Sequence, residues 1–302
     1  MKNLFDSIVE RTVISKGWSD DKKYRVVTED GGIFLLRISS MERRTHRKQL
    51  FEFQKKVEET GIPMCCPVEC GDCEEGFYIL QSWVNGEDAE NVIPSLSERE
   101  QYELGLQSGQ YLQRIHEIPA PNDQPEWEGR FNDKINRKIK RYMECPLKFD
   151  GAEAIIDYIN ANRHLLRDRP QCFQHGDYHV GNMMIENGSL VIIDFDRYDF
   201  GDPWEEFNRI VWCAQKVPVF AAGMVDGYFN SSVPPLFWKL LALYIGSNTL
   251  SSVSWAIAYG EEETRTMLQQ ARDVLEWYDH FQNSLPTWYS QSKERIQKNE
   301  TL

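Results

Sequence analysis

The sequence predicts an α+β protein built as two lobes, a small antiparallel β-sheet with one helix followed by a mostly helical part. Turn residues such as Asp30-Gly31-Gly32 separate short strand-like segments in the N-terminal part. Beyond residue 84, apolar residues recur at helical spacing over long stretches, and aromatic residues are frequent. We therefore expect one domain at residues 1–83 and a second at residues 84–302.

The first lobe is expected to hold a short helix, several strands and one longer helix. Residues 45–59 form the longer helix in this prediction, because Leu50, Phe53 and Val57 fall on one face and Gly61-Ile62-Pro63 ends it. The short helix is expected at residues 1–9, and the strands at residues 12–14, 23–28, 33–38, 66–70 and 76–81.

The second lobe is expected to be helical at residues 97–118, 152–166 and 204–289. Residues 122–150 are basic and irregular, with cationic side chains gathered between residues 130 and 141. We expect these cations to form a solvated helical face. A groove for a phosphorylated or anionic substrate is the alternative.

Charge and hydropathy limit the class of protein. The 302 residues include 34 basic and 47 acidic side chains, a net charge of −13 that argues against general nucleic-acid binding. This charge suits a cationic ligand, although acidity also promotes solubility. Residues 1–13 are too charged for a signal peptide, and no apolar stretch reaches about 18 residues. We therefore expect a cytoplasmic protein without a membrane span.

Seven cysteines without a secretory signal indicate reduced thiols. Four of them gather in one short region, at Cys65, Cys66, Cys70 and Cys73. The last two have the spacing of a zinc knuckle, but no second Cys-x-x-Cys completes a site. A structural zinc ion therefore stays an alternative to a plain strand and turn.

The residues with the clearest chemistry lie between positions 173 and 206. Asp177 follows a histidine and a glycine, Asn182 comes five positions later, and Asp194 follows an apolar run. Phosphoryl transfer needs one carboxylate to orient and deprotonate a hydroxyl. It also needs an amide oxygen and a second carboxylate to hold Mg²⁺ on the nucleotide phosphates. Taken singly, the three residues suit a turn, a left-handed loop position and a strand-end cap, but together they favour this site.

A hairpin is expected to bring two of these residues together. Asn187-Gly188 is a strong turn signal between the apolar segments at residues 183–186 and 190–193. Such a hairpin would place Asn182 and Asp194 at the same end, where one metal ion can bridge them.

A family resemblance sharpens this prediction. The motif His175-Gly-Asp-x-His-x-Gly-Asn182, followed by Ile193-Asp-Phe-Asp196 and Gly201-Asp-Pro203, resembles the aminoglycoside phosphotransferase family, which includes relatives of choline kinase and other small-molecule kinases. The resemblance implies a protein-kinase-like fold and transfer of the γ-phosphoryl group of ATP or GTP, with Mg²⁺, to a hydroxyl group. It implies Asp177 as the base, Asn182 and Asp194 as metal ligands, and His175 and Asp202 as supports. Asp196 is either a second metal contact or exposed.

The resemblance also assigns nucleotide contacts in the first lobe. Arg37 stands where a kinase places its phosphate-binding lysine, with Glu52 as its expected partner. Ser19 lies in the turn that would cover the phosphates, and Ser82 and Val84 lie where the adenine would meet the backbone.

The acceptor is expected to be a small molecule. Few residues separate Asp194 from Gly201-Asp202-Pro203, which leaves no room for the segment that docks a protein substrate. An aminoglycoside suits the acidic composition, while a choline-like, sugar or macrolide acceptor would share the same motifs. The candidates for contact with a cationic acceptor are Glu205, Glu206, Asp226, Trp255, Tyr259, Glu261 and Glu262.

Two other classes compete with the kinase interpretation. A metal-dependent phosphoesterase would share Asp-x-His and Gly-Asn, but the remaining histidines form no ligand-like cluster. A non-catalytic nucleotide-binding protein would suit arginine at position 37, although the complete Asp/Asn/Asp set argues against it.

Overall fold

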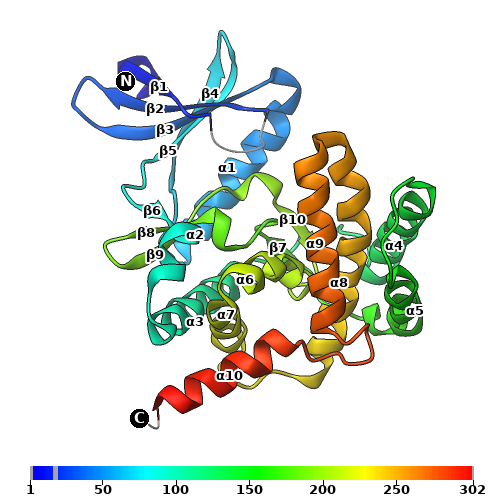
Figure 1. Cartoon of the computed structure of the whole chain (residues 1–302). Coiled ribbons are helices and arrows are strands. Elements are labelled where there is room, and N and C mark those ends of the chain that lie inside the picture. The colour runs from blue at the N-terminus through cyan, green and yellow to red at the C-terminus, as the bar shows by residue number, and fades with distance from the viewer. Residues whose placement is uncertain (1–2, 16–19, 301–302) are drawn as a thin grey trace. The chain divides into compact units, whose positions relative to one another are not determined.

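The computed structural model describes residues 3–15 and 20–300 (Figure 1). It divides into two compact units. The N-terminal unit comprises Met1–Asp88 and Asn182–Tyr198, and the helical unit comprises Ala89–Gly181 and Asp199–Leu302. This division differs from the single boundary expected near residue 83, because residues 182–198 associate with the N-terminal segment.

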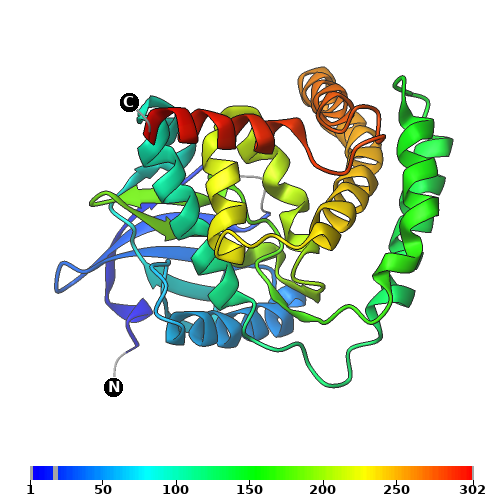
Figure 2. The same ribbon diagram turned by 90° about the horizontal axis from the view of Figure 1, so that it is seen from below.

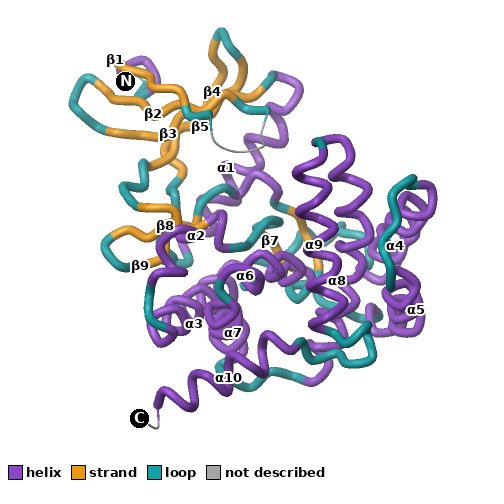
Figure 3. Tube along the Cα trace, in the orientation of Figure 1, coloured by secondary structure: helices purple, strands orange, loops and turns teal. Residues whose placement is uncertain are grey.

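A five-stranded antiparallel sheet forms most of the N-terminal unit, in the order β1-β2-β3-β5-β4 (Figure 3). Its strands are β1 (Ile8–Val13), β2 (Lys22–Thr28), β3 (Ile33–Ser39), β4 (Pro67–Cys73) and β5 (Gly76–Ser82). Helix α1 (Arg44–Glu59) follows β3. The helix expected at residues 1–9 is a single 3-10 turn, Phe5–Ser7, and β1 begins directly after it.

The predicted hairpin is present as β8 (Met183–Glu186) and β9 (Ser189–Ile192). Asn187 and Gly188 form its turn with φ values of 51° and 79°, the left-handed conformation that a two-residue hairpin turn requires. With β6 (Glu87–Asp88) the hairpin forms a three-stranded sheet. Backbone hydrogen bonds from Cys65 to the Ile192 carbonyl and from Ile192 to the Pro63 carbonyl attach the hairpin to the chain after α1.

The helical unit contains nearly all the remaining helices. They are α2 (Ala89–Val92), α3 (Glu98–Ile115), α4 (Trp127–Glu144), α5 (Ala152–Asn162), α6 (Ile210–Lys216), α7 (Pro218–Phe229), α8 (Pro235–Ala256), α9 (Glu261–Trp277) and α10 (Thr287–Glu300). Strands β7 (Cys172–Gln174) and β10 (Asp199–Gly201) pair beside them. An antiparallel sheet followed by a helical part confirms the predicted α+β class.

Helices α3 and α7 approach backbone to backbone in the core of the helical unit. Gly105 and Gly109 on α3 face Gly223 and Gly227 on α7. A Cβ atom built on Gly227 would lie 2.1 Å from the backbone oxygen of Leu106, so only glycine allows this distance.

Helix α4 corrects the expectation of an irregular segment at residues 122–150. It is regular over 18 residues and buries Trp127, Phe131, Ile135 and Tyr142 on one face. Tertiary burial of this face stabilises a helix that its charged residues had obscured.

Helix α8 is strongly apolar, but it does not overturn the expectation of a chain without a membrane span. Together with a 3-10 turn it forms a segment, Pro235–Tyr259, that is long and apolar enough by length and composition. Its most apolar window is 67% buried inside the fold, because α8 lies between α9 and the pair α4 and α5 (Figure 2). This burial is the pattern of a core helix.

Candidate active site

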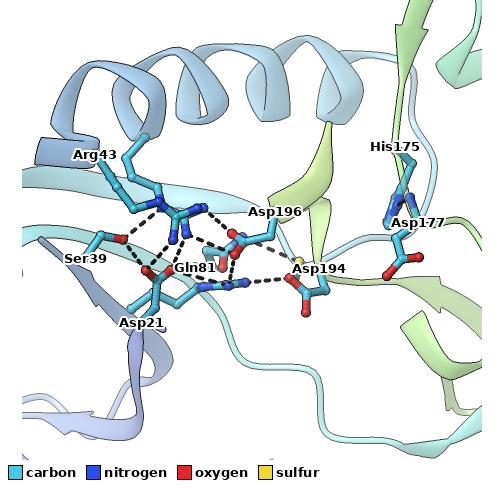
Figure 4. Close-up of polar contacts among 11 residues, drawn as sticks. Asp21, Ser39, Arg43, Gln81, His175, Asp177, Asp194 and Asp196 are labelled. Carbon is cyan, nitrogen blue, oxygen red and sulfur yellow. Dashed lines mark hydrogen bonds and ion pairs between the residues drawn. The ribbon is translucent and has the colours of Figure 1, made fainter. Parts of the chain in front are cut away.

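Residues after β7 hold Asp177 in a rigid loop within the helical unit. The buried Glu206 carboxylate accepts hydrogen bonds from the backbone N–H groups of Gly176, at 3.0 and 3.1 Å, and Tyr178, at 3.4 Å. Nδ1 of the buried His175 accepts the N–H of Asp177 at 3.3 Å (Figure 4). Gly176 has a φ of 84°, which favours glycine at this turn. The loop backbone is therefore fixed on both sides of Asp177.

The carboxylate of Asp177 remains partly exposed, with 19% of its side chain accessible. Its Oδ1 atom lies 3.2 Å from Nε of Arg209 and 3.7 Å from Nε2 of His179. Nδ1 of His179 accepts the backbone N–H of Gly181 at 3.0 Å. A neutral His179 ring therefore carries its hydrogen on Nε2, on the side of Asp177. Asp177 thus faces two donors and solvent.

Asp202 is buried next to β7, the strand that precedes His175 and Asp177. Its two carboxylate oxygens bind Arg169 at 2.7 and 2.9 Å, and one also accepts the hydroxyl of Tyr244 at 2.5 Å. Its backbone carbonyl accepts Nε2 of Gln174, the last residue of β7, at 2.8 Å. Asp202 therefore connects Arg169 and Tyr244 to the end of β7, and its supporting role stays a prediction.

The N-terminal unit contains a network of guanidinium and carboxylate groups (Figure 4). Arg37 on β3 binds Asp194 at 2.8 Å and Asp196 at 2.7 Å. The buried Arg47 on α1 binds Asp196 and lies 2.5 Å from Asp21. Burial alone would raise the pKa of Asp196, but the charges of Arg37 and Arg47 lower it to about 2. Asp196 is therefore an ion-pair partner at the centre of this network.

The two predicted metal ligands meet at one end of the β8–β9 hairpin. Met183 pairs with Ile192, and the backbone N–H of Ile193 donates to the carbonyl of Asn182 at 3.1 Å. Asp194 follows with a φ of 64°, a left-handed conformation that costs free energy in a residue other than glycine. Its side chain is 31% exposed. The predicted hairpin geometry for these residues is confirmed.

The predicted partnership of Arg37 with Glu52 is wrong. Glu52 lies on the exposed face of α1, 3.6 Å from Lys55, with 56% of its side chain accessible. The inner face of α1 presents Arg47, Leu50, Phe51, Gln54 and Val57. Carboxylates after β9 and before β2, instead of one on α1, neutralise Arg37.

The three other residues expected to contact the nucleotide, Ser82, Val84 and Ser19, differ in whether their backbone groups are available. The N–H of Ser82 donates to the carbonyl of Cys66 at 2.8 Å, so it is not available to an adenine. Val84 lies half-buried in the loop between β5 and β6, and among the described residues its backbone makes no hydrogen bond. Ser19 lies outside the described residues.

Three acidic candidates for acceptor binding are instead used inside the helical unit. Glu206 binds the loop backbone, and Glu205 lies 3.0 Å from Nζ of Lys134. The buried Asp226 accepts the hydroxyls of Tyr102, at 2.5 Å, and Tyr289, at 2.7 Å, and also binds a lysine of α10. These carboxylates have no free face for a cationic ligand.

The other acceptor candidates lie at the turn between α8 and α9. The rings of Trp255 and Tyr259 stand 4.3 Å apart, with Tyr259 51% exposed. Glu261 borders a shallow hollow with Ile257 and Leu268, and Glu262 is exposed beside it. Trp255 and Leu268 pack in one cluster with Trp212, whose ring centroid lies 6.1 Å from that of His179.

Burial disfavours the zinc alternative at the cysteine cluster. It raises the pKa of Cys65 to about 12 and raises the pKa of Cys66 and Cys70, which disfavours the thiolate that binds zinc. Within residues 3–15 and 20–300, no three His, Cys, Asp or Glu side chains form a metal-binding group.

Two residues of the site, Arg209 and Arg47, were missed in the sequence, because a cation in a helical segment ordinarily lies exposed. Lys138 belongs to the basic cluster at residues 130–141, for which a groove for an anionic substrate was the alternative. For Lys138 a signal was present. It falls on the stripe of α4 that contains Phe131, Ile135 and Tyr142, where an apolar residue is expected.

An antiparallel sheet, a helical part and an Asp/Asn/Asp set at kinase spacing are the features expected of a small-molecule kinase. A family model described as "Phosphotransferase enzyme family" matches residues 10–237, and the chain belongs to this family. The protein is therefore a phosphotransferase that acts on hydroxyl groups. A search of curated proteins finds no match.

Solved structures show the same fold at low sequence identity. A ternary complex of aminoglycoside phosphotransferase APH(4)-Ia with ADP and hygromycin B is 16% identical, with a TM-score of 0.64 over 90% of this chain and 95% of that one. Amicoumacin kinase hAmiN, in complex with AMP-PNP and Ca²⁺, is 12% identical, with a TM-score of 0.65 over 92% and 91%. The streptomycin–ATP complex of APH(2'')-IIa is 18% identical, with a TM-score of 0.62 over 88% and 91%.

Proposed function

We propose that this protein transfers the γ-phosphoryl group of ATP or GTP to a hydroxyl group of a small molecule, with Asp177 as the base. The proposal rests on one observation, that the backbone of Asp177 is fixed while its carboxylate is partly exposed. Glu206 and His175 fix its backbone, while its carboxylate stays partly exposed. A catalytic base needs both a fixed position and access to the hydroxyl that it deprotonates.

We assign Mg²⁺ to Asn182 and Asp194. One carboxylate oxygen of Asp194 binds Arg37, and the other has no hydrogen bond or ion pair among the described residues. An amide oxygen and one free carboxylate oxygen suit Mg²⁺, which takes few protein ligands and completes its shell with phosphates and water. When bound, the ion would neutralise the charge of the phosphates. The chain's own part is to hold these two ligands at one hairpin end.

Lys23 is assigned to the nucleotide phosphates together with Arg37. The two residues are direct partners in the β2–β3 pairing, so their side chains share one face of the sheet. Arg37 is already held by Asp194 and Asp196, whereas Lys23 makes no ion pair within the described residues. Burial, then the charge of Arg37, lowers the pKa of Lys23, which shows that its ammonium lies near this network. A second cation beside Arg37 supplies the charge that a kinase lysine normally brings.

Val84 is assigned to the adenine. Its backbone groups make no hydrogen bond among the described residues, and they lie two residues after the end of β5. The cytoplasmic location and the choice between ATP and GTP stay predictions.

An aminoglycoside is one candidate acceptor, supported by the hygromycin B and streptomycin named in the related complexes. A coupled nucleotide-turnover assay with Mg²⁺ would test ATP and GTP against aminoglycosides, macrolides, choline and small sugars. The Asp177→Asn variant should lose phosphoryl transfer while it retains nucleotide binding, measured by calorimetry. Near wild-type turnover in this variant would refute Asp177 as the base. Tight Mg-nucleotide binding without turnover of any acceptor would favour a non-catalytic nucleotide-binding protein.

A further inference from the structure

We propose that the acceptor carries an anionic group, a phosphate or a carboxylate, and that Lys138, Lys134 and Arg209 bind it beside Asp177. This inference rests on the proposed phosphoryl transfer. It differs from the cationic acceptor that the acidic composition suggests.

Helix α4 turns two lysines toward the segment that follows Asp202. The buried stripe of α4 contains Phe131, Ile135 and Tyr142, and Lys134 and Lys138 lie on and beside it, four residues apart. Nζ of Lys134 is 3.0 Å from a carboxylate oxygen of Glu205.

A chain of hydrogen bonds fixes the position of α4 relative to β7, the strand that precedes Asp177. Nε1 of Trp127, in the first turn of α4, donates to the hydroxyl of Tyr244 at 3.0 Å. That hydroxyl donates to Asp202, whose carbonyl binds Gln174 at the end of β7. The lysines of α4 are therefore held at a defined place near the loop that carries Asp177.

Lys138 is half-buried and has no hydrogen bond or ion pair among the described residues. Its ammonium nevertheless lies close enough to Lys134, Glu205 and Arg209 for their charges to act on it. Burial and the like charge of Lys134 lower the pKa of Lys138 to about 7. A lysine in such surroundings is destabilising unless an anion comes to it.

The cations around Lys138 outnumber the carboxylates, so one further anion would balance the charge. Two carboxylates face the three cations: Glu205, which binds Lys134, and Asp177, which lies 3.2 Å from Arg209. Glu205 also accepts Nε2 of Gln174 at 3.4 Å, so its oxygens are already engaged. A phosphate or carboxylate at Lys138 would complete the balance of charge.

Arg209 links these two lysines to the proposed base, Asp177. Its guanidinium contacts Asp177 and acts on the charge of Lys138. An acceptor could therefore place its anionic group at Lys138 and its hydroxyl at Asp177, with Arg209 between the two. Binding energy from the anion would then position the hydroxyl for transfer.

A titration with inorganic sulfate tests the pocket without knowledge of the acceptor. Calorimetry would follow sulfate binding to the full-length protein saturated with Mg–ADP, so that the nucleotide site is filled. We expect saturable binding that Lys138→Met weakens about tenfold or more, because a charge-assisted contact is lost. Lys140→Met is the matched control, since Lys140 lies on the same helix with 76% of its side chain exposed. Absence of saturable sulfate binding, or equal binding by Lys138→Met, would overturn the proposal.

Stability separates a binding role from a structural one. Methionine at position 138 removes a desolvated charge from an apolar stripe, so the variant should melt at the same or a higher temperature while it loses sulfate binding. Lys138→Arg should restore most of that binding. A Lys138→Met variant that melts at a lower temperature and binds sulfate normally would show that Lys138 is structural.

Turnover with matched acceptors distinguishes phosphate from carboxylate. Each neutral polyol would be compared with its phosphate ester and its carboxylic acid in the coupled assay, with aminoglycosides as cationic comparisons. We expect turnover with anionic members, and a tenfold or greater rise in KM for the acceptor in Lys138→Met with KM for ATP unchanged. Turnover with neutral or cationic acceptors alone would refute the anionic acceptor and leave the kinase standing. Failure of Mg–ADP to bind would count against the proposed function itself, independently of the sulfate result.

Discussion

Arg47→Met is the perturbation for which the structure gives the clearest magnitude. Arg47 is almost fully buried, with 1% of its side chain exposed, and it lies between Asp21 and Asp196. Its Nε atom also donates to the hydroxyl of Ser39 at 2.8 Å. Methionine keeps the length of the side chain and removes its charge and donors. Two carboxylates would remain in place with less neutralisation.

The expected loss follows from the burial of these carboxylates. Removal of one partner from a buried ion pair costs about 3–5 kcal/mol, because it leaves an uncompensated charge. Asp21 is 1% exposed, but Arg37 and Arg43 also approach it, at 3.5 and 3.3 Å. These cations compensate part of the charge, so we expect the lower end of the range, about 3 kcal/mol.

Denaturant unfolding of the purified protein measures this loss directly. Arg44→Met is the matched control, because Arg44 and its partner Asp72 are 46% and 51% exposed. Solvent screens an exposed pair, so this variant should unfold close to the wild type. If both variants lost the same free energy, or Arg47→Met lost under about 1 kcal/mol, the reasoning on this network would be wrong.

Three further predictions follow from the same structure. The folded pKa of Asp196 is about 2 against an ordinary 3.8, so its stabilisation is present above pH 3.8 and is lost as the pH falls toward 2. That loss amounts to about 2 kcal/mol in acid unfolding, at 1.36 kcal/mol for each pKa unit, and an Asp196→Asn variant should lack it. Gly227→Ala should destabilise the protein by about 2–3 kcal/mol, because the new Cβ atom would overlap with α3. Gly129→Ala is the control, because no atom lies within 4 Å of its new Cβ atom, and thermal melts should show α4 slightly stabilised. Lys23→Met should raise KM for ATP about tenfold, while Lys22→Met, on the exposed neighbour, should leave it unchanged; equal values for the two variants would contradict the phosphate role of Lys23.

Local chemistry explains what could be predicted from the sequence. Asn187-Gly188 adopts the turn that its residue types favour, and the pairing of the hairpin then brings Asn182 and Asp194 to the same end. The spacing of Asp177 after β7 is likewise a property of one short segment. These features needed only short-range geometry, which residue types reveal well.

Features that depend on distant partners could not be predicted in the same way. Glu52 on α1 was the expected partner of Arg37, but that choice depended on which face of the helix turns inward. The carboxylates that bind Arg37 come from two segments far apart in the sequence, Asp21 before β2 and Asp194 and Asp196 after β9. The engagement of the Ser82 N–H could not be foreseen for a similar reason, since its hydrogen-bond partner, Cys66, lies 16 residues away.

The acceptor shows most clearly why composition is a poor guide to a site. A net charge of −13 favoured a cationic ligand, and the carboxylates after β10 were its natural partners. Those carboxylates already have partners within the fold, because Glu206 accepts hydrogen bonds from the loop of Asp177 and Glu205 binds Lys134. The ammonium group of Lys138, by contrast, has no carboxylate partner among the described residues. Net charge describes the field far from the surface, whereas a ligand in a pocket responds to the few charges left unpaired there. An acidic protein can therefore hold a cationic pocket, and the affinity of that pocket for sulfate measures the local charge on which the acceptor depends.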